Sequence, residues 1–128
     1  MFRGEYSAGM LSSRLQALAG STSQDCGSIP AGIATQKAVG CAKSAMLSHK
    51  AFRIAIEHDA TFDSIVWEAV ADDGYGKTWV LIYDSYGVSP TLWVSLCHDV
   101  LFVPFPPLEL KPLRTRDGIK CRAAANEP

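Results

Sequence analysis

The stretch SIVWEAVADDGYGKTWVLIYDSYG, residues 64–87, decides the fold of this chain. Two runs rich in Val, Ile, Trp and Tyr flank the turn-forming centre DDGYGK. Aromatic and β-branched runs favour strands, while aspartate and glycine supply the backbone conformations of a tight turn. The stretch therefore predicts an antiparallel β-hairpin.

Further strands are predicted on both sides of this hairpin. AFRIAIEH (51–58) alternates apolar and polar residues, which is the pattern of a half-buried strand. TLWVSLC (91–97) begins another strand, and VLFV (100–103) either continues it or starts a further one. PFPPLELKP (104–112) is expected to break regular pairing, because proline has no N–H to donate. After it we expect an Asp-Gly turn, a short extended piece that ends at Cys121, and a tail.

Two helices are predicted before the strands. Residues 8–19 and 34–50 both carry apolar residues near helical spacing. The stretch from Gly20 to Gly32 is rich in Ser, Gly and Pro and is predicted to be a loop. Mostly small residues share one side of the second helix, which suits close packing against a sheet: Ala38, Cys41, Ala42, Ala45, Met46 and His49.

This order of elements favours an α+β fold, because helices collected before consecutive strands pack on one face of an antiparallel sheet. We expect two N-terminal helices and then a sheet of roughly four or five antiparallel strands, packed on helix 34–50. The 128 residues fit a single domain, 1–128. Within it, residues 1–24 are expected to be a partly flexible helix and loop, and 122–128 a flexible tail.

Composition narrows the classes of function. The chain is 48% hydrophobic with a formal net charge of -1, and it has no Lys/Arg cluster of the kind that binds nucleic acid. No run of about 18 apolar residues is present, so no transmembrane segment is predicted. Glycine-rich phosphate-binding motifs are also missing, and no cofactor is predicted. An exposed strand edge is compatible with a monomer or a homodimer.

The cysteines are Cys26, Cys41, Cys97 and Cys121, and no two form a C-x-x-C pair. This spacing argues against a zinc ribbon or a thioredoxin-like motif and favours two disulfides in an oxidising compartment. Of the three pairings, we favour Cys26–Cys41 with Cys97–Cys121, because each joins neighbouring elements. A periplasmic or secreted location is therefore expected. Residues 1–24 lack the apolar region of an export signal, so either that signal has been removed or, as the alternative, the chain is cytoplasmic and its thiols are free.

Four features of the sequence together resemble a known group. They are DCG (25–27), a helix that carries Cys41, the stretch from Phe52 to Ser85 that ends in Tyr-Asp-Ser, and a cysteine after Asp-Gly near the C-terminus. This pattern resembles small, uncharacterised bacterial proteins that are exported or lipoprotein-like. The resemblance implies an envelope location and a disulfide framework, and it implies no activity.

Cys97, His98 and Asp99 place a thiol, an imidazole and a carboxylate side by side. In a strand, however, successive side chains point to opposite faces, and a catalytic Cys and His normally meet through the fold. We therefore predict that Cys97 is half of a disulfide and that His98-Asp99 is a polar turn. No catalytic residue is predicted.

The residues that could bind a ligand are Trp79, Tyr83, Asp84, His58 and Asp63. Trp79 and Tyr83 share a strand face and would line either a ligand groove or the core. His58 and Asp63 lie in EHDATFD (57–63), whose oxygen and imidazole groups would suit a divalent metal, but polar residues also gather in loops for solubility alone. We predict no metal site.

The leading hypothesis is a disulfide-stabilised module of the bacterial envelope that binds a protein or a small ligand and has no enzymatic activity. One alternative is a small-ligand enzyme with an aromatic pocket in a cone-shaped α+β barrel, in which the groups near Tyr83, Asp84, His58 and Asp63 do acid–base work. A second alternative is an inhibitor or immunity-type protein.

Overall fold

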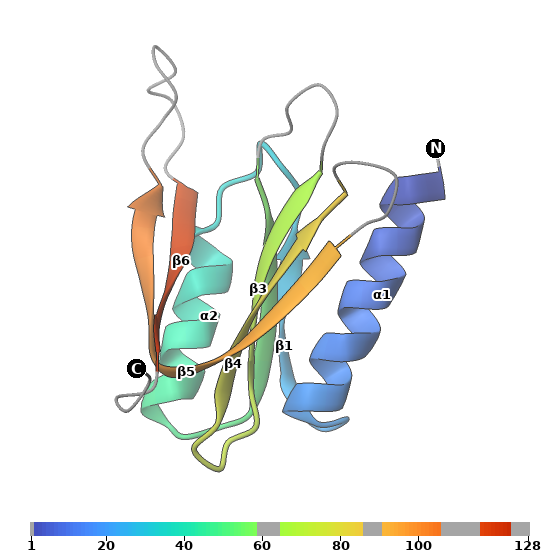
Figure 1. Ribbon diagram of the computed structural model, residues 1–128. Coiled ribbons are helices and arrows are strands. Elements are labelled where there is room, and N and C mark those ends of the chain that lie inside the picture. The colour runs from blue at the N-terminus through green and yellow to red at the C-terminus, as the bar shows by residue number, and fades with distance from the viewer. Residues whose placement is uncertain (1, 59–64, 86–90, 106–115, 124–128) are drawn as a thin grey trace.

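The computed structural model describes residues 2–58, 65–85, 91–105 and 116–123 (Figure 1). The described elements, in chain order, are α1 (Phe2–Ala19), β1 (Gln24–Ile29), α2 (Gln36–Leu47), β2 (Phe52–Glu57), β3 (Val66–Asp72), β4 (Thr78–Asp84), β5 (Thr91–Phe105) and β6 (Arg116–Ala123).

The described strands form one six-stranded sheet in which spatial order follows chain order, from β1 to β6. β1 and β2 are parallel and are joined by α2, whereas every later pair is antiparallel. The α+β class is therefore confirmed. The prediction of four or five strands, all antiparallel and all after the helices, is wrong. The sheet has an additional strand, β1, which lies between the two helices in the chain and is parallel to β2.

β1 falls within residues 20–32, which the sequence analysis assigned to a loop. Its sequence, QDCGSI, has little apolar alternation, and its register against β2 shifts between Asp25 and Ser28. Gly27 within this shift has a φ of 112°, a conformation that glycine adopts without strain. This irregular edge strand is held by β2 and by a disulfide, neither of which is visible as a local sequence pattern.

The β3–β4 hairpin is confirmed, with Asp72 paired to Thr78 across the turn. A carboxylate oxygen of Asp72 accepts a hydrogen bond from the amide of Gly74 at 2.7 Å. Gly74 has a φ of 78°, and a Cβ atom there would lie 3.0 Å from the backbone nitrogen of Ala51. The turn therefore requires glycine at this position both for its backbone conformation and for space.

α1 and α2 lie on opposite faces of the sheet (Figure 1). We call these the α1 face and the α2 face. Under α1 the sheet presents Ala55, Ala69 and Ala71, whose small side chains let Leu11 and Leu15 reach the strands. The α2 face is more bulky, and the small residues of α2 share one buried core there with Phe52, Ile54, Ile56, Val70 and Val80.

α2 is shorter than the predicted helix 34–50. It ends at Leu47, and His49 adopts a left-handed conformation with a φ of 55°. The amide of Lys50 then donates to the carbonyl of Ala45 at 2.9 Å, which closes the helix end and turns the chain into β2.

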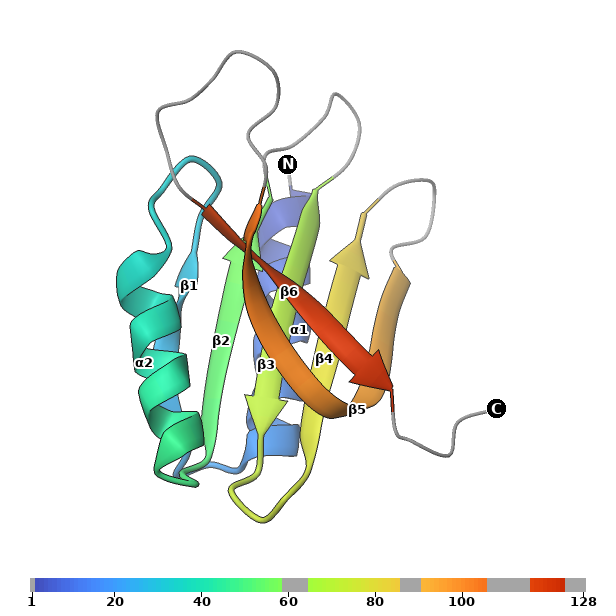
Figure 2. The same cartoon turned by 90° about the vertical axis from the view of Figure 1, so that its left-hand side faces the viewer.

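β5 runs unbroken through both predicted strand segments and past Pro104, so the predicted break at that proline is wrong. It pairs with β4 from Thr91 to Cys97 and with β6 from Cys97 to Phe105, with a register shift at His98. Figure 2 shows β5 bending at its middle, so that β6 runs diagonally across β3 and β4 on the α2 face.

The predicted Asp117-Gly118 turn is also wrong, because both residues lie inside β6 and pair with Pro104 and Val103. The proline-rich residues 106–115 lie outside the described residues.

Candidate functional site

Both predicted disulfides are present, and none of the cysteines is free. Cys26–Cys41 joins β1 to α2, with Cα atoms 5.6 Å apart. Cys97–Cys121 joins β5 to β6, with Cα atoms 5.5 Å apart. Because Cys97 is bonded to another cysteine, it has no thiolate with which to act as a nucleophile. The prediction that Cys97 has a structural role is confirmed.

Asp99, next to the exposed His98, forms an ion pair with Arg122 of β6 at 2.6 Å. The hydrogen bond from this guanidinium is the largest cause of a lowered pKa at Asp99. His98-Asp99 is thus part of the bend in β5, and not the predicted turn. The three neighbours Cys97, His98 and Asp99 have separate roles.

The five predicted ligand residues do not form one site. Trp79 packs beside α1, and alternation along β4 places Tyr83 on the same α1 face. Tyr83 is fully buried, and its hydroxyl has no hydrogen-bond partner among the described residues. His58 and Asp84 continue the alternation of Ile56 and Ile82, which places them on the opposite, α2 face. Asp63 lies outside the described residues.

A buried polar junction on the α2 face was missed by the sequence analysis. Oε1 of Glu68 lies 2.9 Å from Nε2 of His58, and both side chains are mostly buried, with 18% and 14% of their surface exposed. The same oxygen accepts a hydrogen bond from the amide of Ile119 at 3.1 Å. Glu68 therefore connects β2, β3 and β6. A signal was present in the sequence, because Glu68 alternates with Val66 and Val70 on an otherwise apolar strand face.

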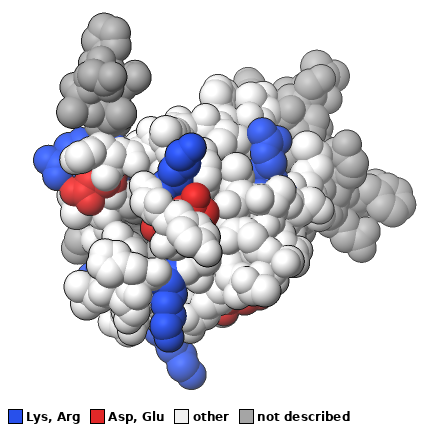
Figure 3. All heavy atoms as spheres, turned by 90° about the horizontal axis from the view of Figure 1, so that it is seen from below, with Lys and Arg blue, Asp and Glu red and all other residues white. Residues whose placement is uncertain are grey.

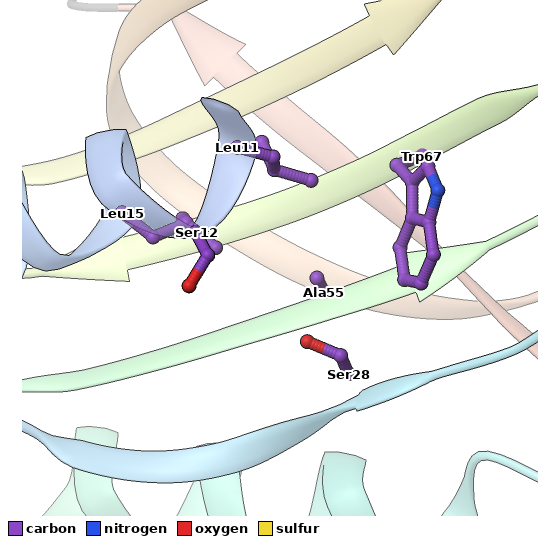
Figure 4. A pocket seen from close by; sticks show the side chains of 6 residues that line it. All are labelled: Leu11, Ser12, Leu15, Ser28, Ala55 and Trp67. Carbon is purple, nitrogen blue, oxygen red and sulfur yellow. The ribbon is translucent and has the colours of Figure 1, made fainter. Parts of the chain in front are cut away.

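A shallow pocket lies between α1 and the β1 side of the sheet (Figure 4). Its empty volume is about 260 Å³, part of which is open solvent. Leu11, Ser12 and Leu15 line it from α1, Ser28 and Ala55 line it from β1 and β2, and Trp67 lies at one end. The pocket is open and mainly apolar, and none of the five predicted ligand residues lines it.

Aliphatic side chains follow the outer, convex side of β5. Leu92 and Val94 pack beside α1, while Val100 and Phe102 pack on the α2 face, so Leu101 and Val103 point outward. We call this set the aliphatic stripe; its members are Leu92, Val94, Leu96, Leu101 and Val103. Leu96 and Leu101 are its most exposed members, at 49% and 47%.

Charged groups are scattered on the face that Figure 3 shows, where some lysines and arginines lie beside acidic side chains and others lie among uncharged ones. Among the described residues, no three His, Cys, Asp or Glu side chains are grouped so that they could hold a metal ion.

No helix in the described part of the chain is both long enough and apolar enough to cross a membrane. Comparison with known protein families, with curated proteins and with solved structures finds no match for this chain.

Proposed function

We propose that this chain is a disulfide-braced interaction module of an oxidising compartment, which docks a protein partner through the aliphatic stripe of β5. The observation that carries the proposal is the exposure of Leu96 and Leu101 on the same convex strand. Exposed apolar side chains that gather on one side of a domain are typical of interaction sites.

The position of α1 supports this assignment. α1 packs over β2, β3 and β4 and leaves the outer side of β5 at its margin. Trp79 is paired with Leu96 across the β4–β5 ladder, so an aromatic ring continues the apolar surface toward the helix. Lys120 is exposed opposite Leu101, and the Asp99–Arg122 pair lies between the two leucines. A matching partner would present an apolar patch with acceptor groups at its rim.

The enzyme alternative has less support. The His58–Glu68 pair is the kind of arrangement that acid–base catalysis uses. The aromatic residues that were to form the pocket, Trp79 and Tyr83, lie on the other face of the sheet, and Tyr83 is fully buried. An inhibitor or immunity-type protein is a special case of the interaction module, in which the partner is an enzyme.

The docking surface can be tested with a photoreactive amino acid placed at Leu96 or at Leu101, in cells of the organism that makes the protein. Leu47 is the matched control, because it is an 84% exposed leucine on α2, outside the stripe. We expect discrete crosslinked adducts from the two stripe positions and none of the same mass from the control. Adducts of equal yield and mass from all three positions, or none from the stripe, would refute the docking surface.

The oxidising compartment is tested separately, by intact mass after thiol alkylation of protein taken directly from those cells. The proposal is supported if the mass of the unreduced protein shows no alkylation and the mass shows alkylated cysteines only after reduction. Alkylation of all four cysteines without reduction would place the chain in a reducing compartment, and the proposed location would be wrong.

A further inference from the structure

The outer edge of β6 is tied to the sheet through one carboxylate. The amide of Ile119 donates to Oε1 of Glu68, so it points away from β5 and belongs to the open edge of β6. The same oxygen lies 2.9 Å from Nε2 of His58, which fixes the position of the carboxylate. Glu68 thus accepts the hydrogen bond that the carbonyl of a neighbouring strand would accept at this point of the edge.

The end of the β5–β6 ladder that lies nearest to β4 is closed covalently, two residues along β6 from Ile119. Cys97–Cys121 lies where β5 leaves β4, next to the register shift at His98. Beyond this point the two strands pair with each other; Val100 is buried in the core, whereas Phe102 and Ile119 are only partly buried against it. The ladder is therefore covalently fixed near one end and held over the α2 face by the buried Val100, by the partly buried Phe102 and Ile119, and by Glu68.

We propose that residues 99–103 and 118–122 form a flap that opens as a unit about the Cys97–Cys121 end, and that Glu68 is the latch that holds it closed. Opening separates Ile119 from Glu68 and exposes the side chains of Val100, Phe102 and Ile119, while β1 to β4 remain paired. The flap is a sub-global opening unit of the kind that amide exchange detects. The flap includes Leu101 and Val103 of the aliphatic stripe, but the inference rests on contacts of the α2 face and does not depend on the proposed docking function.

Amide hydrogen exchange followed by NMR on the disulfide-bonded protein tests the flap. The reporters are the backbone amides of Leu101 and Lys120, two residues that pair with each other across the ladder next to Ile119. The hydrogen bond to Glu68 comes from the amide of Ile119 and not from either reporter. The references are the amides of Val70 and Leu81, in the buried β3–β4 pair. In the wild type we expect exchange at the reporters to be at least about tenfold faster than at the references.

Three variants test the latch. Glu68→Ala should raise reporter exchange about tenfold further, and the references, which exchange only when the whole domain unfolds, should rise by no more than the same factor, because the unfolded chain also lacks the Glu68 contacts. Glu68→Gln, whose amide oxygen can accept the same hydrogen bond, should stay close to the wild type. Glu57→Ala is the matched control, because Glu57 also accepts a backbone amide, that of Ala31 at 3.0 Å, away from the flap. It should not change reporter exchange.

The comparison of reporter and reference exchange in the wild type does not depend on whether any variant folds. Equal exchange at reporters and references would show that the hairpin opens only with the whole molecule, and the flap would be disproved. If the reporter amides exchange at the same rate in Glu68→Ala as in the wild type, Glu68 does not hold the flap closed.

Discussion

The ion pair between Asp99 and Arg122 joins β5 to β6 at the point where β5 changes partner. Arg122 lowers the pKa of Asp99, chiefly through its hydrogen bond. A carboxylate whose pKa is lower in the folded than in the unfolded chain contributes stability above the unfolded pKa, about 4 for aspartate. This contribution is lost as the pH falls through the folded pKa. The pair therefore stabilises the fold at neutral pH and not in strong acid.

We predict that Arg122→Ala raises the pKa of Asp99 toward the ordinary aspartate value. An NMR titration that follows the Asp99 carboxyl carbon measures this shift. Lys120→Ala is the control, because Lys120 lies on the same strand but is paired opposite Leu101, and it should leave the titration unchanged. Identical curves for the wild type and Arg122→Ala would show that the guanidinium is not the cause.

Other single residues differ in how far their sequence context reveals them. The disulfide pairing could be predicted, because each pair joins neighbouring elements within separations of 15 and 24 residues. The Glu68–Ile119 contact could not, since it spans 51 residues and exists only because β5 bends. The split of the predicted ligand site follows from alternation, which sends Tyr83 and Asp84 to opposite faces.

At the scale of elements, α1 depends on the small residues beneath it. Ala69 is fully buried at the centre of the sheet, among the residues that Leu11 and Leu15 cover. We predict that Ala69→Leu lowers the free energy of unfolding by about 1–3 kcal/mol, because the added volume forces α1 away from the strands. Urea unfolding followed by tryptophan fluorescence measures the change.

The matched control for this overpacking is Ala17→Leu, on the exposed side of the same helix. It should change the free energy of unfolding by less than about 0.5 kcal/mol, as surface substitutions usually do. Equal losses for both variants would mean that the alanine face of the sheet does not determine how closely α1 packs.

Strands were predictable where their own residues determine them. The β3–β4 hairpin has apolar alternation on both sides of a glycine turn, and the structure contains it in full. β5 extends past Pro104 because of the position of this proline in the ladder. Pro104 pairs with Asp117, two positions along from the pair Phe102–Ile119, so both pairs have the same hydrogen-bonding geometry. In the pair Phe102–Ile119, the amide of Ile119 points away from β5. By alternation the backbone nitrogen of Pro104 also points away from β6, so its missing N–H breaks no bond of the ladder.

At the scale of the whole molecule, the two disulfides hold the two edges of the sheet. Cys26–Cys41 anchors the irregular strand β1 to α2, and Cys97–Cys121 closes the ladder that carries β6. The strands between them, β2 to β4, are instead held by packing, with α1 on one face and α2 and β6 on the other. Covalent links are thus placed where the sheet has a neighbour on one side only.

Removing either disulfide should therefore destabilise one edge of the sheet without affecting the other edge. We predict that Cys26→Ala with Cys41→Ala, and Cys97→Ala with Cys121→Ala, each lower the free energy of unfolding by about 3 kcal/mol, since each loop gains entropy in the unfolded chain. Because the links lie at opposite edges, the losses should add to about 6 kcal/mol, as large as the whole stability of many domains. Urea unfolding of the wild type, the two paired variants and the fourfold variant measures this. A fourfold variant that unfolds at the same urea concentration as either paired variant would show that the edges are coupled, and that one disulfide already braces the entire sheet.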